Sequence, residues 1–247
     1  FLLTKRFDRG IFTDGGGIAF RAGYTFIDSK NNRNVGSSTA TSSYDVTAAF
    51  DRQNPAVSTS NYETRHNFVV ATSFREQFFG EFDTRLGVFF RASEGRPYSL
   101  VFSNGGVFND SSSGSFNALL YVPSGPNDPN VAPASQANAQ AVLDYVSTLE
   151  DCEFTPGQSI ERNTCRNPWS YDLDLRFSQE IPGPGSLFGV VEDEIELFVD
   201  FDNFLNLIDG GANIRRFTGD VGVANAGYDS QGRYVIGPVR AADYANQ

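Results

Sequence analysis

The sequence predicts an all-β chain: a portion of an antiparallel transmembrane β-barrel with long extracellular loops and one short loop helix. Apolar and polar residues alternate strictly in segments of about ten residues, as they do in strands with one apolar face. The connections between these segments differ greatly in length, as in outer-membrane barrels. The chain is also rich in aromatic residues, with 23 Phe and 10 Tyr among 247 residues.

The alternation is clearest in five segments. In the first, Ile18, Phe20 and Tyr24 share one face, and Arg21 and Gly23 share the other. The same pattern recurs in the other four, so each segment is predicted to be a strand with an apolar and a polar face. The five segments are 18–27, 64–75, 84–93, 169–179 and 194–202.

The connections alternate between short and long. About 36 residues separate the first two segments, only the eight residues 76–83 separate the next two, and some 75 residues follow, 94–168. The link Glu180–Asp193 is short again, and a long polar stretch follows Asn206. Tight periplasmic turns and long extracellular loops give this asymmetry.

A soluble antiparallel sheet produces the same alternation, so a β-sandwich is the alternative fold. The aromatic apolar faces and the long connections favour the membrane barrel, because such loops are uncommon in compact domains. The longest apolar runs fall far short of the roughly 20 residues that a membrane-spanning helix needs. Phe1–Arg6 has neither the apolar core nor the cleavage site of a signal peptide, and we expect further sequence to precede it.

Cys152 and Cys165, with twelve residues between them, lie in a Gly-, Asn- and Pro-rich segment. We expect a disulfide formed in an oxidising compartment, with two unrelated thiols as the alternative. A zinc site is disfavoured because the only histidine, His66, is distant, so no metal or cofactor is expected. The net charge of −11 argues against a nucleic-acid partner, which would require a basic patch.

Catalysis is also disfavoured. With one histidine, the chain offers no Ser-His-Asp set. The carboxylate pairs Asp172/Asp174, Glu194/Glu196 and Asp200/Asp202 are neighbours on one strand face, whereas a glycosidase places its pair about 5–10 Å apart across a cleft. The chain is therefore not expected to be an enzyme.

Several short motifs, in series, resemble the Oar-like branch of the TonB-dependent outer-membrane receptors. The resemblance extends from Leu3 to about Leu207. The motifs that carry it are Leu3–Phe7, Ala22–Phe26 (AGYTF), Gly95–Ser99 (GRPYS), Leu120–Pro123 (LYVP), Arg166–Trp169 (RNPW), Leu173–Phe177 (LDLRF) and Asp200–Asn206 (DFDNFLN).

This resemblance implies that residues 1–247 form about a third of a 22-stranded barrel whose lumen is plugged. It implies an outer-membrane transporter that moves a bulky substrate in a Gram-negative bacterium. Its partners would be its own plug domain, the remaining barrel strands, the TonB complex, and outer-membrane lipid and lipopolysaccharide. The chain departs from the family at Ala245–Gln247, where a final strand would end in an aromatic residue, so that strand is expected to be absent.

The polar faces supply the candidate functional residues, which are predicted to face the lumen or the plug. The early segments contribute arginines and the later two mostly carboxylates. We expect many of these charges to pair across strands or with a plug domain, and a solvated channel lining is the alternative. The residues are Arg21, Arg65, Arg75, Arg85, Arg91, Asp172, Asp174, Arg176, Glu194, Glu196, Asp200 and Asp202.

The long loop before Trp169 contains one expected helix, Gln136–Glu150, in which Val142, Val146 and Leu149 recur at helical spacing and Ser135 could be the cap. Such a loop would either contact an external ligand or only cover the barrel. Tyr24, Trp169 and Tyr171 are suited to an interfacial aromatic girdle. Two further functions stay open: a surface adhesin or secretion-associated barrel, and a soluble carbohydrate-binding β-sandwich.

Overall fold

A computed structural model describes residues 1–33, 35–36, 38–104, 117–210 and 217–240. The described residues are mostly β, with 44% of them in strands and 14% in helices, as the sequence predicts. Within the described ranges, no helix combines the length and apolar character needed to cross a bilayer. The chain divides into two compact units.

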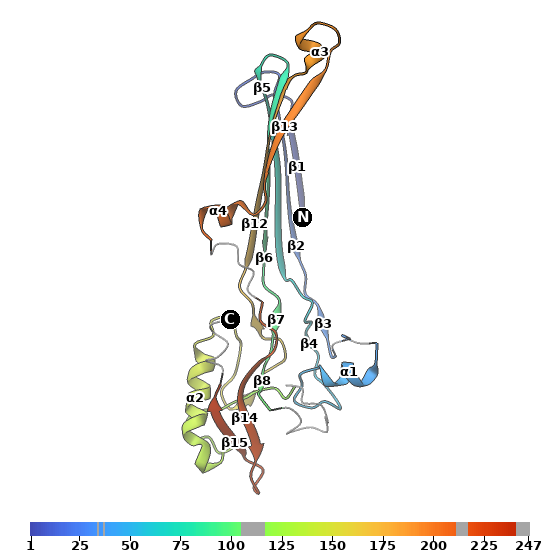
Figure 1. The fold of residues 1–247 in the computed structure, drawn as a ribbon. Coiled ribbons are helices and arrows are strands. Elements are labelled where there is room, and N and C mark those ends of the chain that lie inside the picture. The colour runs from blue at the N-terminus through green and yellow to red at the C-terminus, as the bar shows by residue number, and fades with distance from the viewer. Residues whose placement is uncertain (34, 37, 105–116, 211–216, 241–247) are drawn as a thin grey trace. The chain divides into compact units, whose positions relative to one another are not determined.

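The first, which we call the sheet unit, comprises residues 1–27, 64–94 and 169–216. It contains one six-stranded antiparallel sheet in the order β1-β2-β5-β6-β12-β13, so strands that follow one another in this unit also pair (Figure 1). The strands are β1 (Leu2–Phe7), β2 (Gly17–Phe26), β5 (His66–Phe79), β6 (Phe82–Ser93), β12 (Ser170–Pro182) and β13 (Glu194–Phe201).

Each predicted strand is present, but three run further than the alternation indicates, since β12 also continues past 179 to Pro182. β5 continues past Arg75 to Phe79 through a bulge, and β6 begins at Phe82. The link between them is therefore Gly80-Glu81 rather than eight residues, and Gly80 takes a left-handed conformation (φ +71°) that a tight turn requires.

All three short connections lie at one end of the sheet, because the strands are antiparallel neighbours. They are residues 8–16, residues 80–81, and residues 183–193 with the one-turn helix α3 (Pro184–Leu187). In the last, Asp193 accepts hydrogen bonds from the backbone N–H groups of Ser186 (2.6 Å) and Gly185 (3.1 Å). These bonds lower the pKa of Asp193 and fix the turn.

The second, the loop unit, comprises residues 28–63, 95–168 and 217–247, which follow β2, β6 and β13 respectively. Its largest sheet has three strands in the order β15-β14-β8, with β8 parallel to β14. Its elements are β3 (Lys30–Asn31), α1 (Ala40–Asp45), β4 (Ser58–Thr59), β7 (Pro97–Tyr98), β8 (Leu100–Phe102), β9 (Tyr121–Val122), η1 (Pro133–Ser135), α2 (Gln136–Ser147), β10 (Gln158–Ser159), β11 (Cys165–Arg166), β14 (Val221–Tyr228) and β15 (Tyr234–Val239). The expected C-terminal departure, Ala245–Gln247, lies outside the described residues.

The hydrophobic core belongs to the loop unit. Phe102, Leu120, Val142 and Ile236 are fully buried there, in one cluster drawn from all along the long connections. Among the described residues of the sheet unit, Ala92 is the only buried apolar side chain. The long connections therefore fold as a domain would, whereas the sheet buries almost no apolar side chain within its own unit.

The predicted loop helix is confirmed as α2, which ends at Ser147, and Val142 and Val146 are buried. Ser135 does not cap it. The 3₁₀ turn η1 precedes the helix and leaves Ser135 at φ −109°, ψ 6°, away from the extended backbone that a cap usually has. Its Oγ instead accepts the backbone N–H of Ile236 at 3.1 Å, which ties α2 to β15.

The predicted disulfide is confirmed: Cys152 and Cys165 are bonded across a sequence separation of 13. Replacing both residues by Ser should destabilise the loop unit by about 3 kcal/mol, because the open chain regains loop entropy. The loss is measured by urea unfolding, with proteolytic cleavage within residues 95–168 as the signal for unfolding of the loop unit. Reductant added to the unaltered chain should reproduce the loss, and an unchanged midpoint in both experiments would contradict the expected contribution.

Candidate functional site

The strand pairing places the predicted charged residues on one face of the sheet. Residues paired across antiparallel strands share a face. Arg21 pairs with Ala71, Ala71 with Phe89 and Phe89 with Asp174, so Arg21 and Asp174 lie on the same side. The residues grouped in this way are Arg21, Arg75, Arg85, Arg91, Asp172, Asp174, Arg176, Glu194, Glu196 and Asp200. Arg65 and Asp202 adjoin this set just beyond the ends of β5 and β13.

The same face, which we call the charged face, carries three ionisable residues that the sequence analysis missed. Arg6 lies on β1, Asp83 on β6 and Glu180 on β12. Asp83 and Glu180 fall just outside the strand ends drawn from the sequence, so longer strand boundaries would have found them. The shared face is observed; a role in a lumen or toward a plug remains a prediction.

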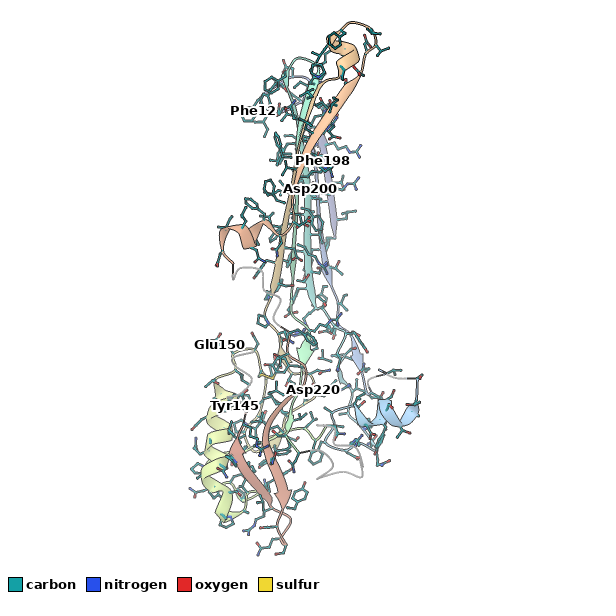
Figure 2. All side chains as sticks on the ribbon, in the orientation of Figure 1. Phe12, Tyr145, Glu150, Phe198, Asp200 and Asp220 are labelled. Atoms are coloured by element: carbon teal, nitrogen blue, oxygen red, sulfur yellow. A yellow bond between two sulfur atoms is a disulfide. The ribbon has the colours of Figure 1, made fainter. Side chains whose placement is uncertain are left out.

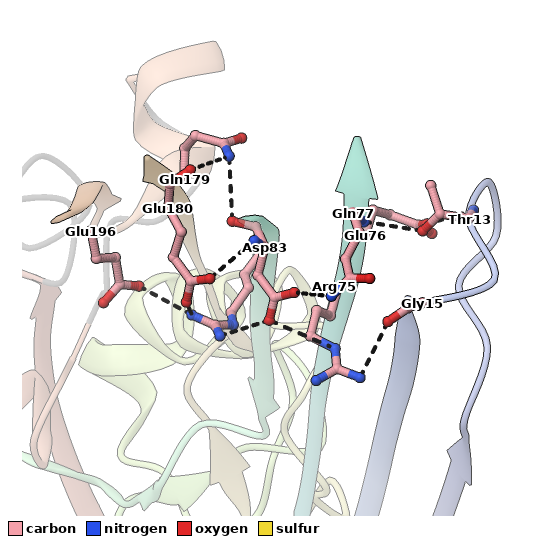
Figure 3. A network of polar contacts seen from close by, with 10 residues as sticks. Thr13, Gly15, Arg75, Glu76, Gln77, Asp83, Gln179, Glu180 and Glu196 are labelled. Atoms are coloured by element: carbon pink, nitrogen blue, oxygen red, sulfur yellow. Dashed lines mark hydrogen bonds and ion pairs between the residues drawn. The ribbon is translucent and has the colours of Figure 1, made fainter. Parts of the chain in front are cut away.

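An ion-pair network joins four strands near the short connections (Figure 3). Arg85 contacts Glu180 at 2.6 Å, Asp83 at 2.8 Å and Glu196 at 3.7 Å. Arg75 extends the network from β5, with its Nε 3.9 Å from Asp83. For these residues the predicted pairing across strands is present without any plug domain.

Pairing along the rest of the charged face is looser. Arg176 lies 3.4 Å from Asp200 and 4.4 Å from the centre of the Phe198 ring, both on β13 (Figure 2). Both charges are substantially exposed, and such pairs contribute at most about 1 kcal/mol. Arg21 and Glu194 make no ion pair with any described residue. Arg6 and Asp202 likewise make none, and all four charges are available to a further domain or to water.

The opposite face, the apolar face, is aliphatic and aromatic over most of its length, with Lys5 of β1 as a charged exception beside Phe20. Its rows follow the register: Tyr24, Phe68, Ala92 and Tyr171 lie in one row. A second row consists of Ile18, Phe74, Leu86, Phe177 and Val199. The large side chains in both rows are half-buried or exposed.

An aromatic row closes the apolar face at the end where the long connections begin. The ring centres of Tyr24 and His66 are 6.1 Å apart, those of His66 and Trp169 6.2 Å, and those of Trp169 and Tyr171 6.5 Å. The Tyr24 hydroxyl and His66 Nδ1 are hydrogen-bonded at 2.8 Å. The predicted girdle residues are thus neighbours, and the single histidine joins them.

A polar belt closes the apolar face at the other end. Glu76, Thr84 and Gln179 are in register across β5, β6 and β12. The Thr84 hydroxyl donates to Gln179 Oε1 at 2.6 Å, and Glu76 accepts the Thr13 hydroxyl at 2.7 Å and the Thr13 N–H at 2.9 Å. The stretch between row and belt, such as 66–75 on β5, matches the roughly 9–11 residues of a tilted membrane-spanning strand.

The loop unit contains a cavity of about 600 Å³. It is lined by residues 48–51, 54–58, 119, 121, 130, 157–162 and 234. Tyr121 and Tyr234 contribute stacked rings with centres 4.5 Å apart, and Phe50 and Val57 contribute exposed apolar side chains. Cavities of this size with mixed lining are typical of small-molecule sites.

Asp128 holds Tyr121, which lines the cavity, by accepting a hydrogen bond from its hydroxyl. Burial by itself would raise the pKa of Asp128, but hydrogen bonds from the Ser124 and Asn130 amides and the Tyr121 hydroxyl lower it. The pKa of Tyr121 is raised to about 12 by burial and by its hydrogen bond to Asp128.

The raised Tyr121 pKa predicts a stability loss in alkali. The unfolded phenol ionises near pH 10, so the stabilisation is complete below about pH 10 and is lost as the pH rises toward about 12. Urea unfolding of the loop unit from pH 9 to 12 should show this fall, and Tyr121→Phe should make it shallower. The idea fails if the two proteins have parallel pH profiles.

Buried polar contacts join the three segments of the loop unit. Arg162 Nε donates to Ser58 Oγ (2.9 Å), and the Asn163 amide donates to the Thr59 carbonyl (2.6 Å). Ser99 connects Asn163 to Asp220, whose carboxylate accepts the Ser99 N–H at 2.9 Å. Burial lowers the pKa of Arg162 and raises that of Asp220. Glu63, wholly buried, pairs with Arg166.

The described residues contain no cluster of three or more His, Cys, Asp or Glu side chains arranged as metal ligands would be. The carboxylate pairs of β12 and β13 stay side by side on the charged face. Comparison with known proteins yields no relative: no family model matches the chain, and no curated protein or solved structure is significantly similar to it.

Proposed function

We propose that this chain is part of the wall of an outer-membrane β-barrel transporter, with its apolar face against lipid and its charged face toward the lumen. The observation that carries the proposal is the two-faced sheet bounded by the aromatic row and the polar belt. A band of apolar side chains about ten residues long, ended on one side by stacked aromatic rings, is what a strand crossing a bilayer requires.

The apolar face supports a lipid environment because its own unit offers no alternative cover. Val199 is 51% exposed and Leu197 56% exposed, and the described residues of the sheet unit contain no second sheet. Covering apolar surface stabilises a protein by roughly 25 cal/mol per Å². Lipid tails provide that cover, whereas the soluble β-sandwich requires a packed second layer.

The sheet edges support a larger barrel. Within the part of the chain that the structure describes, β1 and β13 each pair on one side only. Every backbone amide in hydrocarbon must be hydrogen-bonded within the protein, so a membrane sheet has no free edge. In the proposed protein these edges pair with the remaining barrel strands, and Arg21 and Glu194 face a plug domain or the water around it.

The transport proposal extends this architecture by resemblance to the Oar-like receptors. Energy would come through the TonB complex, and the loop unit, on the lipopolysaccharide side, would meet a bulky external substrate. The second candidate is a surface adhesin or secretion-associated barrel. It is favoured by one observation: the long connections have their own core and cavity, as a binding domain would.

Vesicle flotation tests the membrane proposal. The full-length protein, in which the remaining barrel strands pair with β1 and β13, should rise with phospholipid vesicles in a density gradient after refolding and resist extraction by carbonate. Without amphiphile it should aggregate. A monodisperse, water-soluble monomer that stays at the bottom of the gradient would overturn the proposal.

The sequence of the complete gene separates transport from adhesion. A plug domain with an energy-coupling motif encoded ahead of Phe1 is the expected finding. Adhesive repeats encoded there in place of a plug would support the second candidate and remove TonB coupling.

A further inference from the structure

The short connections carry exposed apolar residues that the lipid-facing band does not account for. We call six of them the turn-end patch: Ile11, Phe12, Phe79, Leu187, Phe188 and Val190. Their exposed fractions run from 59% for Ile11 to 82% for Phe188. They come from all three short connections or the strand ends beside them, at one end of the sheet.

The polar belt separates this patch from the lipid-facing band. On the apolar face the belt is Glu76, Thr84 and Gln179; on the charged face Arg85 and its carboxylate partners lie at the same level (Figure 3). A level that is polar on both faces suits the headgroup region. The turn-end patch lies on the connections and strand ends that adjoin the belt, and Figure 2 shows Phe12 nearer to that end of the sheet than Phe198.

Hydrogen bonds hold the patch in place. Glu76 accepts the backbone N–H groups of Ile11, Phe12 and Thr13, which sets the first connection, and the Phe12 and Phe78 rings pack with centres 6.0 Å apart. Asp193 fixes the connection that contains Leu187 and Phe188. An exposed apolar surface whose backbone is already held in place is typical of an interaction site, because a partner that binds it loses little conformational entropy in ordering it.

The charges around the patch indicate the partner. The three connections contain Asp8, Asp14, Glu81, Glu192 and Asp193 but one basic residue, Arg9, which pairs with Asp14 at 2.8 Å. An acidic rim is repelled by anionic lipid headgroups and attracts a basic surface.

We propose that the turn-end patch is a docking surface for a protein partner that presents an apolar patch rimmed by Lys and Arg. The inference rests on the proposed function, since the belt then marks the membrane boundary. A membrane-immersed patch and a patch joined to a second copy of this chain are the competing outcomes.

Fluorescence quenching locates the patch. In the full-length barrel, with Trp169 and any further tryptophan replaced by Phe, a single Trp is placed at Phe188 or at Leu175 and the protein is reconstituted in vesicles. Phe188→Trp should be quenched by aqueous acrylamide and not by brominated lipid, and Leu175→Trp the reverse. Lipid quenching of the Phe188→Trp chain overturns the docking surface. If the Leu175→Trp chain is not quenched by brominated lipid, the membrane proposal is overturned instead. The two failures are therefore distinguishable.

A basic amphipathic peptide of Leu and Lys is the binding probe, added to the reconstituted Phe188→Trp chain in zwitterionic vesicles, with empty vesicles subtracted. Its binding should shift the emission of the introduced indole to the blue. A Leu/Glu peptide should bind at least about tenfold more weakly, as should the Leu/Lys peptide after Ile11→Ser with Phe12→Ser. Equal binding in either comparison contradicts the proposal, and so does an emission shift that depends on chain concentration alone.

A matched control is available in α4 (Phe204–Ile208), which follows β13 partway along the sheet, where Phe201 pairs with Leu175 of β12 (Figure 1). Leu207 and Ile208 are about as exposed as the patch residues, at 70% and 71%. Leu207→Ser with Ile208→Ser removes similar apolar area and should leave peptide binding unchanged. A loss equal to that of the patch variant would show non-specific adhesion and would refute the docking surface.

Discussion

Val88→Arg is expected to prevent stable assembly of the chain in a membrane, whereas Phe89→Arg, the next residue on β6, is expected to be tolerated. Val88 lies on the apolar face, paired with Thr72 and Leu175 near the middle of the band. An Arg facing lipid at mid-depth costs a barrel about 2–4 kcal/mol. Phe89 lies on the charged face opposite Asp174, which can accept the new cation.

The pair is measured by refolding both variants into vesicles and comparing the free energy of unfolding in urea. The two substitutions add the same side chain at adjacent positions, so strand propensity and net charge are matched. Equal destabilisation would show that the two faces are not in different environments. A greater loss for Phe89→Arg would place the charged face against the apolar phase and reverse the assignment.

Glu63→Ala is expected to unfold the loop unit while leaving the sheet intact. Glu63 is wholly buried, accepts the Ser29 N–H at 2.6 Å and pairs with Arg166, so it joins segment 28–63 to segment 95–168. Removing one partner of a buried pair leaves an uncompensated charge and costs about 3–5 kcal/mol. The measurement is limited proteolysis, with cleavage expected in 28–63 and 95–168 before any in β5 or β6.

The double variant Glu63→Leu with Arg166→Met is the control, because replacing a whole buried pair by apolar groups is often neutral. It should restore much of the protease resistance. If Glu63→Ala alone were fully resistant, the pair would not hold the segments together. If the double variant were as labile as the single, packing volume rather than the charge would explain the loss.

The alternation of apolar and polar residues predicted the sheet well. A strand whose two faces lie in different environments has a sequence with a period of two. Ile18 to Phe26 and Tyr171 to Phe177 illustrate this, and both faces could be assigned. The strand ends near the short connections were misplaced. There the bulge after Glu76 and the polar belt break the alternation, so Phe79, Asp83 and Glu180 were assigned to turns.

Apart from α2 and the disulfide, the fold of the loop unit could not be predicted, because its contacts join residues far apart in the chain. Arg162 bonds Ser58 and Asn31 across more than a hundred residues, and Asp220 bonds Ser99 across 121. Such pairs leave no period in the sequence. The available signal was local: the apolar runs Leu100–Phe102 and Leu119–Val122, which a solvated loop has no reason to contain.

The candidate site was predicted as a set but not as a network. Alternation placed Arg85, Arg176 and Asp200 on one face, yet only register between neighbouring strands shows which of them meet. Ser135 shows a local prediction that tertiary contacts overrode. Its position in the sequence suits a helix cap, but its hydroxyl accepts the backbone N–H of Ile236 on β15 instead.

Spin labels placed one at a time at 171 to 178 on β12, in the full-length barrel inserted in vesicles, test the central claim most directly. Collision with oxygen, which concentrates in lipid, should be high at 171, 173, 175 and 177. Collision with a water-soluble nickel complex should be high at 172, 174 and 176, whereas Ser178 is buried and 178 should be poorly accessible to the complex. A uniform response along β12, or low oxygen collision at every odd position, would contradict a lipid-facing apolar face.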